Sequence, residues 1–257
     1  MEDAVRAATG LPKIRRVGLD APFAWLAGAA RDFQTAWLPC LVYGVAIAVV
    51  SYFLARALIV SDLAFWALTL SCGFVFIGPM LAMGFYEAGR RLEAGEKPSL
   101  SSILFVRSAL RQDVAYLGLA LVFIYFLWTR LAQIVYGLST FRLHTTVEEF
   151  IAFALNTGEG HTMLIAGTIV GGIIAFATFA LVVVSAPMLL DQRSNVFEAV
   201  ITSVASVARN FLPLALWAFL IAALLVISAA TWFLALAVVF PWLGLASWRA
   251  YRALVER

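Results

Sequence analysis

The sequence predicts an all-α, polytopic membrane protein with six transmembrane helices, arranged as three repeats of an amphipathic surface helix and a two-helix hairpin. Three observations carry this prediction: the composition, the spacing of the charged residues and a recurring pattern. The 257 residues are 63% hydrophobic and 13% charged, so polar groups are too few to cover a globular surface in water. Stretches of about 20 apolar residues, the length that crosses a bilayer, fit between the charges six times.

The first predicted hairpin consists of spans over residues 37–58 and 63–86, with Ser61 and Asp62 as the polar turn between them. Residues 1–18 precede it as a polar tail. Charges recur through the first 35 residues without a continuous apolar segment, so we expect no secretory signal there. The N-terminus is therefore predicted to stay on the side of the membrane where it is made.

The second hairpin is predicted from spans over residues 114–138 and 163–190, on either side of the longest polar interruption, residues 139–161. The third follows from residues 211–246, which carry no charge and are too many for one helix across a hydrocarbon core of about 30 Å. We divide them near residues 228–231 into two short spans. One long tilted helix is the alternative, but it would put the C-terminal arginines opposite the other basic segments.

Basic residues set the predicted orientation, because Lys and Arg near the ends of spans are retained in the cytoplasm. With six spans, all of the 18 basic residues except Arg56, Arg130 and Arg142 lie at the termini or in the loops of one side. Both termini are therefore predicted to be cytoplasmic. The net charge of +3 follows from the same retention and indicates anionic lipid, not nucleic acid, as a partner.

Three stretches on the basic side have the periodicity of amphipathic helices at a membrane surface: residues 20–32, 99–113 and 194–209. The third stretch divides most clearly into two helical faces. The apolar face holds Phe197, Val200, Ile201, Val204 and Ala208, and the polar face holds Glu198, Thr202, Ser203 and Ser206.

Each surface stretch precedes a hairpin, and each hairpin ends in a similar segment that contains Pro79, Pro187 or Pro241. The chain is therefore predicted to be a single integral membrane domain, residues 1–257, with an internal repeat architecture. The three repeats cover residues 19–97, 98–193 and 194–257.

Three segments carry a resemblance to a known family: KIRRVGLDAPFAWLAGAARDF, GPMLAMGFYEAGRRLEAGEKPSL and PWLGLASWRAYR. They resemble a family of uncharacterised bacterial integral membrane proteins that is defined as a domain of unknown function. The resemblance extends over nearly the whole chain. It implies a bacterial inner-membrane location and six helices, and it implies no activity.

Ionisable residues within predicted spans are the first candidates for a functional site. Glu87 ends the second span one turn before two arginines, and this spacing favours an ion pair at the depth of the headgroups over a proton-relay role. Arg130 lies deeper, in a strongly apolar span. Its expected partner is Glu148 or Glu149, and a role in transport is the alternative.

Three arginines occupy matching places, where a surface helix turns into the first span of its hairpin: Arg31, Arg111 and Arg209. A guanidinium at that depth can donate bidentate hydrogen bonds to lipid phosphate, and the alternative is a role in charge retention alone. On the fourth span, Gly167, Gly171 and Ala175 form a ridge of small residues that predicts close helix packing.

No motif indicates catalysis, a cofactor or a bound metal. Cys40 and Cys72 fall within predicted spans and are interpreted as small apolar residues. Haem and copper centres need several intramembrane histidines, whereas both histidines of this chain lie in the polar interruption. The metal-capable groups there lack the spacing of a helical zinc site and favour a solvated loop: His144, His161, Glu148, Glu149 and Glu159.

These patterns predict a non-enzymatic membrane protein that scaffolds or assists another membrane complex, or organises lipid at the cytoplasmic leaflet. The expected partners are the phospholipid bilayer and a second membrane protein. A small transporter or channel is the alternative, since repeats and proline-interrupted spans recur in transporters. An enzyme acting on lipid would need a carboxylate or histidine constellation that the sequence does not supply.

Overall fold

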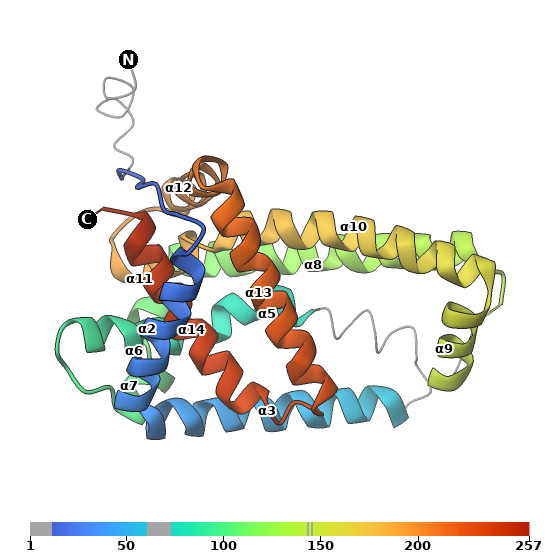
Figure 1. Cartoon of the computed structure of the whole chain (residues 1–257), viewed down its shortest axis with the longest axis horizontal. Helices are drawn as coiled ribbons and strands as arrows, with labels where there is room; N and C mark the ends of the chain where they lie inside the picture. The colour runs from blue at the N-terminus through green and yellow to red at the C-terminus, as the bar shows by residue number, and fades with distance from the viewer. Residues whose placement is uncertain (1–11, 61–72, 143, 145, 257) are drawn as a thin grey trace, which may run out of the picture. The chain divides into compact units, whose positions relative to one another are not determined.

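The computed structural model describes residues 12–60, 73–142, 144 and 146–256, and within them every regular element is a helix apart from one isolated bridge between Ile14 and Val255. The all-α prediction is confirmed for this part of the chain. The elements, labelled as in Figure 1, are α2 (Ala21–Thr35), α3 (Trp37–Val60), α5 (Phe74–Leu81), α6 (Met83–Glu93), α7 (Leu100–Leu104), η1 (Arg107–Leu110), α8 (Gln112–Ser139), α9 (Val147–Asn156), α10 (Gly158–Val182), α11 (Ser185–Asp191), α12 (Val196–Arg209), α13 (Phe211–Ala230) and α14 (Leu236–Leu254).

Contacts divide the chain into two compact units, which are described separately. Unit 1 comprises Met1–Ala48, Pro79–Leu117 and Phe179–Arg257, and unit 2 comprises Val49–Gly78 and Gly118–Thr178. Unit 1 contains the chain termini, the proline-containing segments and the predicted surface helices, so it carries most of the functional argument.

Four helices of the described residues are long and apolar enough to cross a membrane: α3, α8, α10 continued by α11, and α13. The chain is thus an integral membrane protein by the length and composition of its helices. Part of the second predicted span, residues 63–72, lies outside the described residues, and the rest of it holds α5 and the start of α6. The sixth is a helix, α14, but Arg249 and Arg252 in its C-terminal half keep it out of these four. Six spans therefore stay a prediction.

The charge-free stretch 211–246 is broken where the sequence predicts. α13 ends at Ala230, and the chain turns through Trp232 and Phe233, whose φ angles are 52° and 64°, before α14 begins. Phe233 N donates to Ser228 O at 2.8 Å, which closes the end of α13 in the manner of a Schellman turn. One long helix over 211–246 is therefore excluded.

A proline lies in the second helix of each predicted hairpin, where it lacks the N–H that a helix needs and its ring crowds the preceding turn. α5 contains Pro79 and gives way to α6, α11 contains Pro187 and follows the end of α10, and Pro241 lies inside α14. We call α6, α11 and α14 the arms.

The break between α10 and α11 frees backbone groups that a side chain of α12 takes up. Ser203 Oγ accepts a hydrogen bond from Val184 N at 3.1 Å and donates one to Ala180 O at 2.7 Å. In an unbroken helix this N–H would donate directly to this carbonyl, four residues earlier. The Ser203 hydroxyl is therefore inserted into the helical ladder at the break.

The three arms pack against one another in unit 1, and each also carries one surface element: α2 lies on α14, α7 on α6, and α12 on α11 (Figure 1). Glycines allow close approach between the arms. A Cβ added at Gly89 would lie 2.6 Å from Trp248, and one at Gly244 would lie 2.6 Å from Phe85. The centre is filled by fully buried side chains that include Phe85, Met188, Leu189, Leu245 and Tyr251.

The surface elements differ from the expectation in two ways. The stretch 99–113 is not one helix, because the short α7, capped by Ser99, ends at Leu104 and is followed by the 3-10 turn η1. α12 has the two predicted faces, but Thr202, Ser203 and Ser206 of its polar face are buried and Glu198 is half-buried, whereas Phe197 on the apolar face is 77% exposed. An amphipathic helix on a membrane normally turns its polar face to water. In this protein that face of α12 packs against the rest of unit 1 instead.

The predicted polar tail is fixed to the body of unit 1 over its described part. Ile14 pairs with Val255, and the buried side chain of Asn210 accepts from Val17 N at 2.9 Å and donates to Arg15 O at 3.0 Å. The carboxamide thus pairs with the chain as a neighbouring strand would.

We expect Asn210→Ala to release this segment at a cost of about 1–2 kcal/mol, since two backbone hydrogen bonds to a buried side chain are lost. Limited proteolysis near Arg15 should become faster in the variant, while the melting temperature falls only modestly. Unchanged proteolysis would show that the pairing of Ile14 with Val255 holds the segment without Asn210.

Candidate functional site

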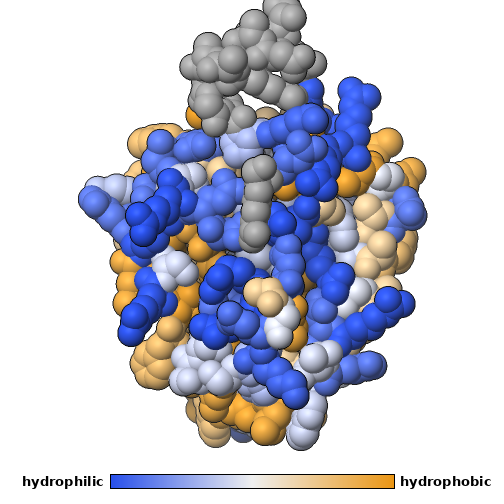
Figure 2. Space-filling model, turned by 90° about the vertical axis from the view of Figure 1, so that its left-hand side faces the viewer, coloured by the Kyte–Doolittle hydropathy of each residue, from blue (hydrophilic) through white to orange (hydrophobic). Residues whose placement is uncertain are grey.

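The polar residues of unit 1 gather at the end where the arms lie. Figure 2 shows this face, from the side on which α6 and α7 lie in Figure 1, with hydrophilic residues over its centre and hydrophobic residues around them. A polar patch ringed by apolar surface is the pattern expected where a membrane protein leaves the bilayer.

Glu87, on the arm α6, is 5% exposed and forms the ion pairs that its spacing predicts. Arg90 donates to its two carboxylate oxygens at 2.7 and 2.8 Å, and Arg91 Nε donates at 2.7 Å. Burial alone would raise the pKa of this carboxyl, but the hydrogen bonds and charges of the two arginines outweigh burial and hold the pKa below its usual value. Glu87 is thus an anion whose two oxygens are bonded to both arginines, as the predicted ion pair requires.

A second polar contact joins the arms α11 and α14. Tyr251 Oη donates to Asp191 Oδ2 at 2.9 Å and accepts from Gln192 Nε2 at 2.9 Å. Burial, followed by the charge of Asp191, raises the pKa of Tyr251, so this phenol stays protonated and serves as a donor.

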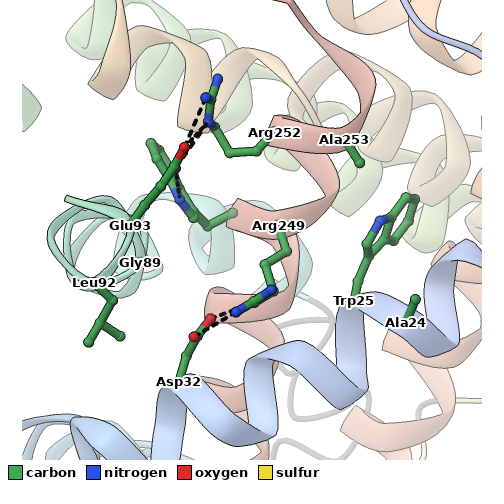
Figure 3. A pocket seen from close by; sticks show the side chains of 10 residues that line it. Ala24, Trp25, Asp32, Gly89, Leu92, Glu93, Arg249, Arg252 and Ala253 are labelled. Atoms are coloured by element: carbon green, nitrogen blue, oxygen red, sulfur yellow. Dashed lines mark hydrogen bonds and ion pairs between the residues drawn. The ribbon is translucent and has the colours of Figure 1, made fainter. Parts of the chain in front are cut away.

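A cleft of about 470 Å³ lies between α2, α6 and α14, and we take it as the candidate site. Its floor is α14, and its charged walls come from the other two helices (Figure 3). Arg249 Nε and Nη2 bind Asp32 of α2 at 2.5 and 2.7 Å, and Arg252 Nε binds Glu93 of α6 at 3.0 Å. The hydrogen bond and charge of Asp32 raise the pKa of Arg249, which is cationic at any physiological pH.

The cleft combines these two ion pairs with apolar and aromatic surface. Trp248 donates its indole N–H to Glu93 Oε2 at 3.2 Å, and Trp25 and Leu92 complete the lining. With two guanidinium and two carboxylate groups the lining is electrically balanced. Such a site suits a small ligand that carries both charges better than a simple anion or cation.

The predicted lipid-phosphate arginines lie in three different settings. Arg31 is exposed on α2, and Arg209 is the last residue of α12. Arg111 precedes α8 and donates to the carbonyls of Leu189 and Gln192 at 3.0 and 2.7 Å, so it closes the C-terminal end of α11. The sequence did not predict this contact, and the phosphate role stays a prediction for all three.

The remaining predicted site residues lie in unit 2. A Cβ added at Gly171 would lie 3.0 Å from the ring of Trp128, whereas one at Gly167 would meet open space; Ala175 is half-buried. Arg130 Nη1 donates to Gln133 Oε1 at 3.1 Å, one turn along its own helix. The guanidinium thus has a local partner, different from the glutamates predicted for it.

The polar interruption 139–161 is more ordered than the predicted solvated loop, because most of its second half forms α9. Phe150 and Ala154 of α9 pack with Tyr136 and Met163 in a small apolar cluster. Tyr136 Oη lies 2.9 Å from His144 Nδ1, and the imidazole stacks on Phe153. Over the described residues, no three His, Cys, Asp or Glu side chains come together as metal ligands.

Sequence reasoning missed the residues of the cleft. It assigned Arg249 and Arg252 to charge retention and gave no role to Asp32 or Glu93. One signal was present: Arg249 and Arg252 are three residues apart and therefore share a helical face beside Trp248. The acidic partners come from α2 and α6, far away in the sequence, and no local pattern identifies them.

The sequence model of a family described as "Predicted integral membrane protein (DUF2189)" matches residues 67–191. This match confirms the resemblance to integral membrane proteins of unknown function, and it contains the second of the three segments that carry the resemblance. No curated protein and no solved structure matches the chain.

Proposed function

We propose that this chain, whose residues 67–191 match a family of predicted integral membrane proteins, is a non-enzymatic protein that organises lipid at one leaflet of the bacterial inner membrane. The observation that carries the proposal is the arrangement of α12. Its side chains Thr202, Ser203 and Ser206 are buried against the protein, and Phe197, Ile201 and Val204 point outward with 77%, 52% and 43% exposure. Side chains of this size are stable on an outer surface when lipid covers them.

The other two surface elements are similarly apolar on the outside. We call the exposed apolar side chains of the three elements the collar: Phe23 of α2, Leu104, Phe105 and Leu110 of the α7–η1 segment, and Phe197, Ile201 and Val204 of α12. α2 lies on α14, α7 on α6 and α12 on α11, while η1 also contacts α11, so the collar is divided among the three arms. Apolar surface divided among three arms favours many small molecules, such as lipids, over one large partner that would cover a single patch.

The packing of the surface elements on the arms links the proposed function to the predicted repeats. In terms of the predicted repeats, the surface element of each repeat lies on the arm of the one before it, and that of the first lies on the arm of the third. Three repeats connected in this cyclic way would present equivalent collar elements around one polar end. A single protein could then contact lipid on all sides of that end.

We place the polar end of unit 1 at the cytoplasmic leaflet, because the arms and the segments beside them carry most of the basic residues. The termini would then be cytoplasmic. A reporter fused after Arg257 that is active only in the periplasm would contradict this orientation.

Lipid retention tests the function. We expect the triple variant Phe197→Ser, Ile201→Ser, Val204→Ser to insert and fold, because the buried face of α12 is unchanged. After purification in mild detergent it should carry severalfold less phospholipid than the wild type, since the apolar surface that holds the acyl chains is reduced. Mass spectrometry of the co-purified lipid measures the effect.

The matched control is Leu138→Ser with Phe141→Ser, which removes two exposed apolar side chains outside the collar. This variant should retain lipid as the wild type does. If the collar variant kept its lipid but lost a stoichiometric membrane-protein partner, the collar would be a protein interface and the chain a scaffold. Stabilisation of the wild type by one small solute, with no lipid effect, would favour the transporter alternative.

A further inference from the structure

We propose that the collar selects anionic phospholipid, and that Arg31, Arg107 and Arg193 supply the selectivity by binding the lipid phosphates. The inference rests on the proposed function, because it takes lipid as the occupant of the collar. It adds the chemical class of that lipid, a phosphodiester headgroup without a cationic group of its own. It also assigns the phosphate contacts to a set of arginines that differs from the set predicted from the sequence.

The arginine of α2 lies in line with the apolar part of the collar. Phe23, Ala27 and Arg31 are all exposed and follow one another at intervals of four residues, so they form one row along the helix. The span α3 begins shortly after this row with Trp37, which is 55% exposed. Tryptophan favours the depth of the headgroups, so Arg31 lies within reach of the lipid phosphates.

The other two collar elements combine the same groups. Arg107 is exposed in η1 between Phe105 and Leu110, which are 79% and 87% exposed, and the span α8 begins shortly after this turn. Arg193 is exposed in the turn that joins α11 to α12, four residues before Phe197. Both arginines thus lie next to an end of a membrane-capable helix and near side chains that favour hydrocarbon.

The guanidinium groups of these three arginines have no polar partner in the described part of the chain. The arginines that hold the arms together are instead bound by carboxylates: Arg90 and Arg91 by Glu87, Arg249 by Asp32, and Arg252 by Glu93. The charges on the collar elements are therefore those that the fold leaves without a counter-charge. A ligand with a net negative charge is the complement of such a surface.

Acidic residues on the collar elements do not neutralise these arginines. The stretch 99–110, which contains α7 and η1, has no acidic residue. Asp32 of α2 is bonded through both oxygens to Arg249. Glu198 of α12 is half-buried in the first turn of that helix, where the helix dipole stabilises a negative charge. Asp20 is exposed at the start of α2, about three turns from Arg31.

Two of the arginines predicted from the sequence are less suited to bind phosphate. Arg111 donates to three backbone carbonyls in and after α11 and lies 3.7 Å from Asp113, so its donors and its charge are taken up within the protein. Arg209 is half-buried at the C-terminal end of α12. The exposed arginines of the same two collar elements, Arg107 and Arg193, take their places in the proposal.

A lipid with a net negative charge fits this surface better than a zwitterionic one. Guanidinium groups bind phosphate oxygens through paired hydrogen bonds, and phosphatidylglycerol and phosphatidylcholine both carry that phosphate. The choline lipid also carries a cation, which repels arginine, whereas the glycerol lipid keeps a single negative charge. A basic residue near an anionic leaflet favours binding by about fivefold, so the choice between the two lipids is measurable.

The test uses the full chain in detergent micelles that contain phosphatidylglycerol and phosphatidylcholine in equal amounts and with the same acyl chains. Mass spectrometry measures the ratio of the two lipids that stay bound when the protein is purified from this mixture. We expect about a fivefold excess of phosphatidylglycerol. The excess should fall as the salt concentration rises, because salt screens exposed charges.

One variant locates the preference. The triple substitution Arg31→Gln, Arg107→Gln, Arg193→Gln removes the three charges and should bring the ratio close to one. The variant should fold as the wild type does, because these side chains have no polar partner in the described part of the protein. Melting curves without added lipid verify that it is folded.

The matched control removes the same number of positive charges from exposed positions outside the collar elements: Arg16→Gln, Lys97→Gln and Arg56→Gln. This variant should keep the excess of phosphatidylglycerol. It separates contacts at the collar from a general attraction of anionic lipid to a basic protein.

Each outcome decides the proposal. A wild-type ratio near one with lipid still retained would overturn the selectivity and leave the proposed function standing, whereas a wild type that retains no lipid would overturn both. An excess that survives in the folded triple variant, or that the control variant also loses, would overturn the assignment to the collar arginines. If the wild type held both lipids equally and the triple variant lost a membrane-protein partner, the arginines would contact protein and not lipid.

Discussion

Gly44→Ala is expected to destabilise the protein by roughly 2 kcal/mol or more, although alanine is the better helix former. Gly44 is buried in α3 where this helix crosses α14. A Cβ there would lie 2.7 Å from Pro241 Cγ and would press still more closely on the carbonyl oxygen of Ala237. One obstacle is a backbone carbonyl and the other is a rigid proline ring, and neither can rotate aside. The helices must therefore separate to admit one methyl group.

The matched control is the same substitution at Gly167, where an added Cβ meets nothing within 4 Å. Gly167→Ala should leave the apparent melting temperature in detergent unchanged or raise it. The gain in helix propensity stabilises the folded state by up to about 1 kcal/mol. The comparison also tests the predicted ridge on α10. If Gly167→Ala proved as damaging as Gly44→Ala, close packing at Gly167 would have to come from a contact outside the described residues or from a second copy.

Ser203→Ala is expected to cost about 2–4 kcal/mol, because it leaves two buried backbone groups, Val184 N–H and Ala180 C=O, without the hydroxyl between them. The break at α10 and α11 cannot close to restore the direct bond, since Pro187 holds the start of α11. The variant should melt well below the wild type, and α11 should exchange its amide hydrogens faster.

Ser206→Ala provides the control, since Ser206 is equally buried on the same face of α12 and its hydroxyl donates to Thr202 O, one turn earlier in its own helix. That carbonyl keeps its helical partner when the hydroxyl is removed, so the loss should be small. Equal destabilisation by the two substitutions would mean that volume on this face, not the inserted hydroxyl, determines stability.

Features that depend on neighbours in the sequence could be predicted. The break after Ala230 follows from an apolar stretch too long for one span, and the Glu87 ion pairs follow from spacings of three and four residues. The two faces of α12 follow from helical periodicity. In each of these cases the partners lie within a few turns, so the geometry of a helix alone brings them together.

Features that depend on tertiary contacts could not be predicted from the sequence. Periodicity divides α12 into two faces but does not state which face meets protein, and small hydroxyl side chains suit water and a tight helix contact equally well. The ion pair of Asp32 with Arg249 joins α2 to α14 across most of the chain. The interruption at Phe105, between α7 and η1, could not be predicted because the stretch 99–113 contains no proline or glycine.

The most direct test of the account is the environment of α12 in a bilayer, since the proposed function depends on its apolar face meeting lipid. Single cysteines at Phe197, Ile201 and Thr202, in a background without native cysteines, can carry nitroxide labels in reconstituted vesicles. Labels at Phe197 and Ile201 should be relaxed strongly by oxygen, which concentrates in hydrocarbon, and weakly by a water-soluble nickel chelate, while a label at Thr202 should be shielded from both. Stronger relaxation by the nickel chelate at Phe197 and Ile201 would place this face in water and contradict the account.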